Sequence, residues 1–213
     1  MYKRIQITII SVIAVFLFAA HTNKLPKVLI IGDSISAGYT PFVKELLKDE
    51  ATVIRNEGNA RYTGFGLIKI NEWLGEENWD VIQFNWGLWD MYGWRYKDSI
   101  RTPDVYAKNL EILIARLEET GAKLIWATTT PVCTGPEKND LMVIDLKTEN
   151  AFRKAALRVM KRHEIQVNDL YAFIKPKQNE YAMGDNDVHF TTEGYQYLAG
   201  HVADEIRKKL KHE

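Results

Sequence analysis

A serine at the end of an apolar run is the first residue of this chain that could do chemistry. The stretch Ile30–Ser36 reads Ile-Ile-Gly-Asp-Ser-Ile-Ser, so a run of β-forming residues ends on Gly32, Asp33 and Ser34. A serine between a strand and the next helix lies near free backbone N–H groups, which can stabilise a developing oxyanion. The tripeptide Gly-Asp-Ser alone favours an ordinary turn in which the serine caps a helix. Ser34 therefore needs partners elsewhere in the chain.

The second segment with chemical potential contains a histidine among acidic residues. His189 ends the stretch Asp-Asn-Asp-Val-His, with Asp187 two residues and Asp185 four residues before it. A histidine can act as a general base towards a serine hydroxyl, and a carboxylate on its other ring nitrogen holds the required tautomer. A lone histidine is more often structural, but these flanking acids favour a functional interpretation.

Two further loops carry residues that can donate a hydrogen bond. Gly58 follows the short apolar stretch Thr52–Arg55, and its backbone N–H could face a pocket. Asn85 ends the stretch Asp80–Asn85 and could donate its side-chain amide. Each is also a common turn residue, so their meaning depends on where the elements place them.

Strand-like and helix-like patterns alternate along the chain, and this alternation predicts how these residues are positioned. Short β-forming runs predict five strands, at 27–31, 52–55, 80–85, 123–128 and, more weakly, 166–170. Helical spacing and helix start and stop signals predict helices at 41–48, 64–74, 103–120, 148–163 and 192–210. The pattern predicts an α/β protein, a three-layer α/β/α sandwich with a five-stranded parallel sheet. In such sheets the ligand binds beyond the carboxyl ends of the strands, where Ser34, Gly58 and Asn85 all lie.

The composition is that of a globular protein and excludes several classes of function. Of the 213 residues, 46% are hydrophobic and 26% charged. Lys+Arg and Asp+Glu both number 28, which argues against a nucleic-acid partner because such proteins carry a basic excess. The single cysteine, Cys133, excludes an internal disulfide framework and a cysteine-built zinc site. We expect neither a metal nor another cofactor.

The first residues differ from the rest of the chain. Lys3 and Arg4 precede the almost wholly apolar run Ile5–Ala20, which is short for a membrane span of ~20 residues. Residues 1–22 are therefore predicted to be a secretory signal peptide, with an uncleaved N-terminal anchor as the alternative. Residues 24–213 are predicted to form the single folded domain. Both interpretations predict an extracytoplasmic, periplasmic or secreted protein that contacts a membrane only through an unprocessed N-terminal segment.

Taken in order, four segments resemble the blocks of the SGNH (GDSL-type) hydrolase family. These are Gly-Asp-Ser at 32–34, Glu-Gly-Asn-Ala-Arg at 57–61, Gly-Leu-Trp-Asp at 87–90 and Asp-Asn-Asp-Val-His-Phe-Thr at 185–191. The resemblance covers residues 27 to about 210 and implies a flavodoxin-like SGNH hydrolase fold. It implies Ser34 as nucleophile, His189 as base, and the N–H groups of Ser34 and Gly58 as oxyanion donors. The Asp-Val-His-Phe pattern resembles an acetylesterase-like bacterial subgroup that carries its acid at the position of Asp187.

Two departures from the family pattern concern the supporting residues. The oxyanion-binding asparagine of the third block falls on Trp89, and we expect Asn85 to replace it, with the Trp89 indole N–H or a two-donor site as alternatives. The usual acid position falls on Asn186. We assign the orienting role to Asp187, with Asp185 as second choice; if neither reaches, Ser34 and His189 form a dyad.

An aromatic stretch after the third predicted strand suggests the substrate. Trp86, Trp89 and Trp94 lie there among basic residues, and exposed rings of this kind suit flat, amphipathic ligands such as sugars. The alternative is that these rings simply pack the loop down. The predicted function is a serine esterase acting on short-chain acyl esters, foremost O-acetyl groups of a glycan. A carbohydrate-binding relative without turnover and an acyltransferase of the same fold are the alternatives.

Overall fold

Five parallel strands form the centre of the protein. The computed structural model describes residues 24–92, 101–132, 144–184 and 187–211. The strands are β1 (Lys27–Ile31), β2 (Thr52–Arg55), β3 (Val81–Phe84), β4 (Lys123–Ala127) and β5 (Gln166–Asn168). They pair in the order β2-β1-β3-β4-β5, and every pairing is parallel. The predicted five-stranded parallel sheet is confirmed.

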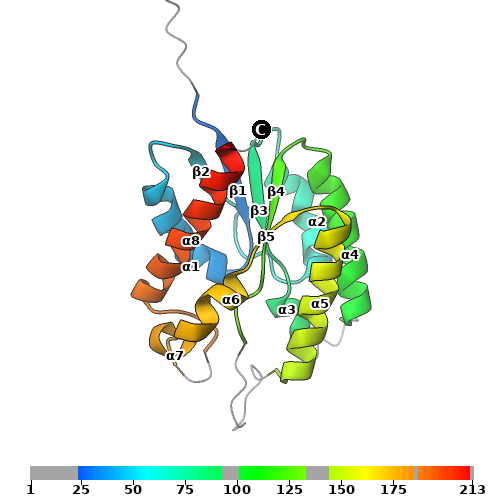
Figure 1. Cartoon of the computed structure of the whole chain (residues 1–213). Helices are drawn as coiled ribbons and strands as arrows, with labels where there is room; N and C mark the ends of the chain where they lie inside the picture. The colour runs from blue at the N-terminus through cyan, green and yellow to red at the C-terminus, as the bar shows by residue number, and fades with distance from the viewer. Residues whose placement is uncertain (1–23, 93–100, 133–143, 185–186, 212–213) are drawn as a thin grey trace, which may run out of the picture.

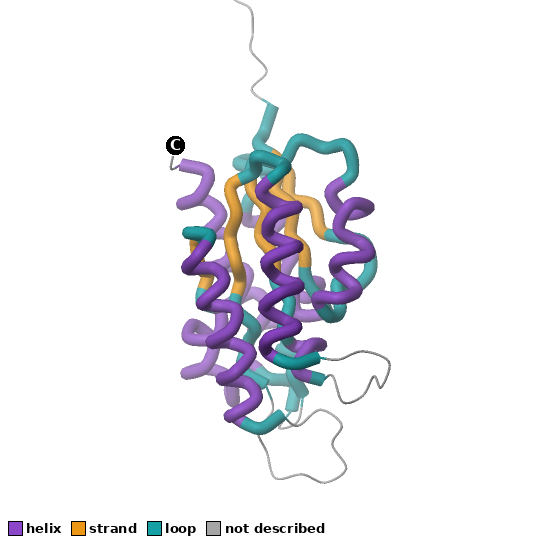
Figure 2. The backbone as a smooth tube through the Cα atoms, turned by 90° about the vertical axis from the view of Figure 1, so that its right-hand side faces the viewer, coloured by secondary structure: helices purple, strands orange, loops and turns teal. Residues whose placement is uncertain are grey.

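Helices cover both faces of this sheet (Figure 1). Helices α1 (Ser34–Leu46) and α8 (Thr192–Lys211) pack together on one face. Helices α2 (Thr63–Leu74), α4 (Pro103–Glu118) and α5 (Leu146–Arg162) cover the other face, and from that side the strands pass behind them (Figure 2). Short elements lie beyond the carboxyl ends of the strands: α3 (Leu88–Met91), α6 (Leu170–Ile174), the 3₁₀ turn η2 (Lys175–Lys177) and α7 (Gln178–Tyr181). This is the predicted three-layer α/β/α arrangement.

The strands form where apolar residues run without interruption, because the sheet is covered on both faces. Residues 28–31 of β1 and all four residues of β3 are buried. The predicted fifth strand is shorter than expected, since the Asp169 carboxylate accepts a hydrogen bond from the Ala172 N–H at 3.1 Å and starts α6. A buried polar pair also links the sheet internally, with Asn168 Nδ2 donating to Gln83 Oε1 at 3.0 Å.

The first helix begins earlier than the sequence predicts, and the expected start at Pro41 is wrong. The Asp33 Oδ1 accepts a hydrogen bond from the Ile35 N–H at 3.0 Å, which caps the helix at Ser34 instead. Pro41 lies inside α1, where it lacks the N–H that would bond four residues back. The adjacent Thr40 hydroxyl donates to the Ser36 carbonyl at 2.6 Å and adds a hydrogen bond in that turn. Ser34 is consequently the first residue of a 13-residue helix.

The predicted N-terminal signal segment, residues 1–22, lies outside the described residues. Among the helices that the structure does describe, none combines the length and the apolar character needed to cross a bilayer. The assignment of that segment stays a prediction.

Candidate active site

Three side chains form one hydrogen-bonded chain beyond the carboxyl ends of the strands. His189 Nε2 lies 3.0 Å from Ser34 Oγ, and His189 Nδ1 lies 2.6 Å from Asp187 Oδ1. Ser34 begins α1, whereas Asp187 and His189 precede α8. Because α1 and α8 pack side by side, residues 155 positions apart in the sequence meet at the same end of the sheet. The sequence predicted these three residues as a group, and the structure brings them together.

The segment that carries the acid and the base is a compact turn. Asp187 Oδ1 accepts a hydrogen bond from the His189 backbone N–H at 2.9 Å as well as contacting its ring. The Met183 N–H donates to the His189 carbonyl at 3.0 Å, and an antiparallel bridge joins Ala182 to Phe190. The imidazole therefore projects from a backbone that is fixed on both sides. Asp185, the second choice for the acid, lies outside the described residues.

The environment keeps Asp187 available as a carboxylate. Burial acts to raise its pKa, but the hydrogen bonds from the His189 backbone and ring outweigh burial and hold that pKa below its usual range. The side chains of Asp187 and His189 are 41% and 35% exposed, so this site is open to solvent rather than enclosed. An ionised carboxylate on Nδ1 leaves Nε2 free to accept the proton of the Ser34 hydroxyl.

The loop that contains Gly58 lies against the loop that contains Ser34. The Ala60 N–H donates to the Gly32 carbonyl at 3.1 Å, and the Gly32 N–H donates to Asn56 Oδ1 at 2.9 Å. Gly58 has a φ of +67°, a left-handed conformation that glycine adopts at little cost. Its role as an oxyanion donor stays a prediction. Arg55 hydrogen-bonds to both loops but was not predicted as a site residue. Its only signal in the sequence is its position at the end of a predicted strand, three residues before Gly58.

Asn85 lies beside the loop that leads to Ser34, but its side-chain amide donates its hydrogen bond to the sheet. Its Nδ2 donates to the Ala127 carbonyl at 2.7 Å and lies 3.4 Å from Thr129 Oγ1. The Asn85 Cβ would lie 3.9 Å from a Cβ added at Gly32, so the side chain adjoins the loop that ends in Ser34. The predicted oxyanion role of Asn85 would require the amide to divide its two N–H groups between Ala127 and a substrate, and it stays a prediction.

The predicted substrate contact by Trp86 is wrong. Its side chain is 1% exposed and packs in the core against Trp73 and Phe84. The Trp86 indole N–H donates to the Ala60 carbonyl at 3.2 Å, so the buried ring holds the loop after β2 against the core. Trp89 is partly buried and packs against the same core, and its substrate contact stays a prediction.

Trp94, the third tryptophan expected to contact the substrate, lies outside the described residues. The described part of the chain contains no group of three or more His, Cys, Asp or Glu side chains arranged to hold a metal ion.

Asp90, the last residue of Gly-Leu-Trp-Asp, supports the start of α2 from the loop after β3. Its side chain is 2% exposed, and both carboxylate oxygens lie 3.1 Å from the Thr63 N–H. The Thr63 hydroxyl donates to Asp90 Oδ1 at 2.6 Å and accepts from Asn109 Nδ2 at 3.0 Å. Burial raises the Asp90 pKa to about 7, against the lowering effect of the Thr63 hydrogen bonds and the Arg101 charge.

This raised pKa predicts a pH-dependent stability. The unfolded Asp90 loses its proton near its ordinary value of 3.8, whereas the folded protein retains the proton up to about 7. The contribution of Asp90 to the unfolding free energy therefore falls as pH rises from 4 to 7, by at most about 1.4 kcal/mol per pH unit. Urea unfolding of wild type and Asp90→Asn at pH 5, 6, 7 and 8 measures it. The difference between the two proteins should change over this range; parallel stability curves would contradict the prediction.

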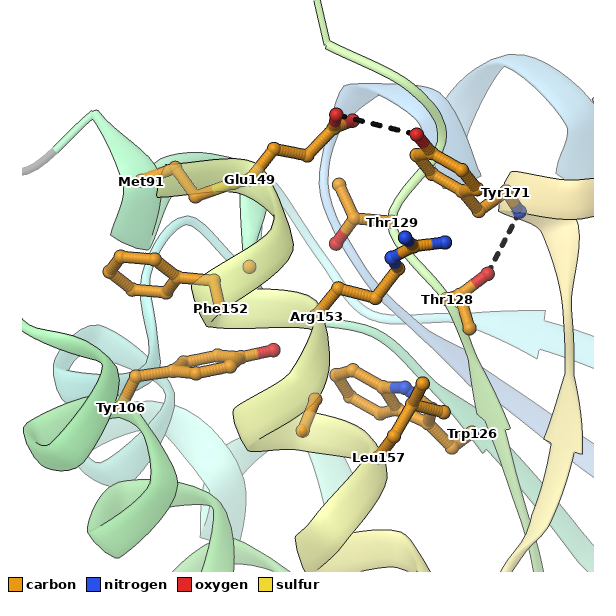
Figure 3. A pocket seen from close by; sticks show the side chains of 12 residues that line it. Met91, Tyr106, Trp126, Thr128, Thr129, Glu149, Phe152, Arg153, Leu157 and Tyr171 are labelled. Carbon is orange, nitrogen blue, oxygen red and sulfur yellow. Dashed lines mark hydrogen bonds between the residues drawn. The ribbon is translucent and has the colours of Figure 1, made fainter. Parts of the chain in front are cut away.

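A small pocket adjoins these loops beyond β3 and β4, against α5 (Figure 3). Its walls are mainly aromatic and apolar, with one buried carboxylate, that of Glu149. Glu149 accepts hydrogen bonds from the Val132 N–H at 3.1 Å and the Tyr171 hydroxyl at 3.4 Å. Thr128 Oγ1 accepts from the Tyr171 N–H at 2.8 Å. These polar groups brace the segment that directly follows Ala127, the last residue of β4, whose carbonyl Asn85 contacts.

Comparisons with known proteins agree with this fold and identify the family. The profile of the GDSL-like lipase/acylhydrolase family matches residues 30–197. An arylesterase from Vibrio mimicus is 24% identical over 219 residues, covering 96% of this chain and 100% of that protein. A lipase/acylhydrolase from Enterococcus faecalis superposes with a TM-score of 0.73 and 26% identity, covering 89% of this chain and 99% of that one. An acetylxylan esterase from Geobacillus stearothermophilus shares the fold, with a TM-score of 0.67, 17% identity and coverage of 88% and 95%. Because the family profile spans well over half of the sequence, the chain belongs to the GDSL-like lipase/acylhydrolase family of ester hydrolases.

Proposed function

We propose that the chain hydrolyses short-chain acyl esters, foremost O-acetyl groups on a carbohydrate, through a Ser34–His189–Asp187 acyl-enzyme mechanism. The observation that carries this proposal is the hydrogen-bonded chain from Asp187 Oδ1 through the His189 ring to Ser34 Oγ. His189 removes the Ser34 proton as Ser34 Oγ attacks the ester carbonyl. It then transfers that proton to the ester oxygen of the leaving group, which departs as an alcohol.

The second half of the reaction repeats these steps with water. His189 accepts a proton from the water that attacks the acyl-Ser34 ester, and then returns it to Ser34 Oγ as the carboxylic acid leaves. The negative oxygen formed in each half is held by the backbone N–H groups of Ser34 and Gly58, with Asn85 as a third donor. Asp187 stabilises the imidazolium that forms twice in each cycle.

The openness of the site supports an ester carried on a large molecule. The side chains of Asp187 and His189 are both more than a third exposed, so a bulky alcohol portion can approach them. Aromatic rings remain partly exposed near the loops: Arg101 stacks on Tyr62 at 3.7 Å and Arg61 lies over Phe65 at 4.7 Å. A guanidinium group over one face of each ring places N–H donors for sugar hydroxyls beside an apolar surface. Structural relatives described as acetylxylan esterases support the same substrate class.

The proposal is tested with two series of substrates. Rates of p-nitrophenol release from the acetate, butyrate and octanoate esters report the acyl preference, and we expect the acetate to exceed the octanoate by at least about tenfold in kcat/KM. Acetate release from acetylated xylo-oligosaccharides and from acetylated glucose reports the carbohydrate preference. A faster octanoate reaction would contradict the short-chain assignment. No turnover of any ester, with no phosphonate adduct at Ser34, would contradict the esterase mechanism itself.

A further inference from the structure

Arg55 holds the nucleophile loop and the Gly58 loop together through its whole guanidinium group. Its Nη2 donates to the carbonyls of Gly32 at 3.1 Å and Asp33 at 2.9 Å. Its Nη1 donates to the carbonyls of Asn56 at 2.9 Å and Gly58 at 2.8 Å. The Nε–H donates to Ser36 Oγ at 3.1 Å. All five N–H donors of this planar group therefore have an acceptor, four of them in the two loops and the fifth in the first turn of α1.

The acceptors of Arg55 lie in the peptide units that matter for an oxyanion. The Asp33 carbonyl and the Ser34 N–H belong to the same planar peptide unit, so fixing the carbonyl also fixes the direction of that N–H. On the other loop, the carbonyls of Asn56 and Gly58 belong to the two peptide units on either side of the unit that carries the Gly58 N–H. Arg55 thus holds the carbonyl of the peptide unit that carries the Ser34 N–H and the carbonyls of the two units that flank the Gly58 N–H.

The charge of Arg55 adds to this geometric effect. A cation that hydrogen-bonds to a peptide carbonyl polarises the peptide unit and makes its N–H a stronger donor. The Asp33 carbonyl also accepts from the Ser36 hydroxyl at 2.7 Å and the Ala37 N–H at 3.1 Å, which polarise the same unit further. Lysine could not reproduce this arrangement, because an ammonium group has three donors on one atom and cannot span four carbonyls as a flat guanidinium does.

We propose that Arg55 is a positioning residue that sets the spacing and direction of the Ser34 and Gly58 N–H groups, and so builds the oxyanion site. The proposal rests on the proposed esterase function and adds to it a residue that no motif identifies. Arg55 lies at the end of β2, next to Ile30 of β1 in the parallel register. Its backbone is consequently fixed by the sheet, and its side chain adds hydrogen bonds to two loops that otherwise have few backbone hydrogen bonds to the sheet or to each other.

The experiment compares Arg55→Lys and Arg55→Gln with Arg207→Lys. Arg207 is a matched control, because its side chain also makes several hydrogen bonds, to Glu50 at 2.8 and 3.1 Å, Asp204 at 2.9 Å and the Leu46 carbonyl at 2.7 Å. The bonds to Leu46 and Glu50 join α8 to the end of α1 and the turn after it, and the bond to Asp204 lies within α8, so none involves the loops next to Ser34 and Gly58. All measurements are expressed per active site, counted by complete labelling of Ser34 with a phosphonate, so unfolded molecules do not contribute.

Two readouts separate positioning of the oxyanion site from general stabilisation. We expect both Arg55 variants to lose about 10²-fold in kcat for p-nitrophenyl acetate, with KM within about twofold of wild type. Binding of phenylboronic acid, whose tetrahedral Ser34 adduct places an oxygen at the oxyanion position, should weaken by a similar factor. Arg207→Lys should match wild type in both readouts.

The outcomes distinguish this inference from the proposed function. An unchanged kcat per labelled site in the Arg55 variants, or a reduced kcat with unchanged boronic acid affinity, overturns the role of Arg55 while leaving the esterase function intact. A wild-type protein that neither hydrolyses the ester nor reacts with the phosphonate overturns the proposed function itself, and the role of Arg55 with it.

Discussion

Ser34→Ala is expected to lower kcat for p-nitrophenyl acetate by about 10⁶-fold, because the variant has no atom that can form the acyl-enzyme. Ser34 Oγ is 3.0 Å from the only ring nitrogen of His189 that does not contact Asp187. The fold should tolerate the change. Asp33, not Ser34, caps α1, and we expect the unfolding free energy to shift by no more than about 1 kcal/mol.

The measurement combines steady-state kinetics with mass spectrometry after phosphonate treatment. Wild type should gain one adduct on the peptide that contains Ser34, and Ser34→Ala should gain none. His201→Gln is a suitable control, since His201 stacks on Phe173 at 4.0 Å on the side of α8 that faces α6 and makes no contact with Ser34. Turnover by Ser34→Ala at a rate similar to wild type, or labelling at another residue, would exclude Ser34 as the nucleophile.

The sheet could be predicted from sequence because a covered parallel sheet leaves a strong local signal. Each buried strand is an uninterrupted apolar or β-branched run, and helical periodicity separates the runs. The start of α1 could not be predicted with equal accuracy. Pro41 is a typical first-turn residue, whereas the residue that starts the helix is the cap Asp33, whose hydrogen bond to the Ile35 N–H spans only two positions. Two valid local signals competed, and the sequence contains nothing that ranks them.

The position of Ser34 followed from one topological rule, that the carboxyl ends of parallel strands share an edge, whereas His189 was indicated by its flanking acids and by the family resemblance. The aromatic residues after β3 obey no such rule. Trp86 turns into the core to contact Phe84, whereas Trp89, three residues later, is partly exposed. Between the end of β3 and the single turn of α3 (Leu88–Met91), the segment is too short for a periodicity that indicates which side chains point inward. The role of Arg55 could not be predicted for a different reason. Four of its five hydrogen bonds go to backbone carbonyls, which every residue type carries, so no residue identity indicates them.

The identity of the acid gives the second large prediction. Asp187→Ala is expected to reduce kcat by about 10⁴-fold, because the His189 ring loses both its orientation and the charge that stabilises the imidazolium. Asp185→Ala should retain the wild-type rate, since the Nδ1 of His189 already lies 2.6 Å from Asp187 Oδ1. The comparison uses kcat for p-nitrophenyl acetate, again per labelled Ser34. If Asp185→Ala loses activity and Asp187→Ala does not, the assignment of the acid is wrong; if neither does, the site functions as a Ser–His dyad.

Asp187→Asn tests how the two-residue spacing of acid and base works. Asp187 Oδ1 accepts from both the backbone N–H and the ring Nδ1 of His189, at 2.9 and 2.6 Å, so the backbone of the base itself selects which atom faces the ring. In the asparagine variant the same backbone N–H should hold the amide oxygen, rather than the NH₂ group, towards Nδ1. The productive tautomer would then survive, and only the charge that stabilises the imidazolium would be lost. We therefore expect Asp187→Asn to retain more activity than Asp187→Ala. An asparagine variant as inactive as the alanine variant would show that the backbone hydrogen bond does not control the tautomer.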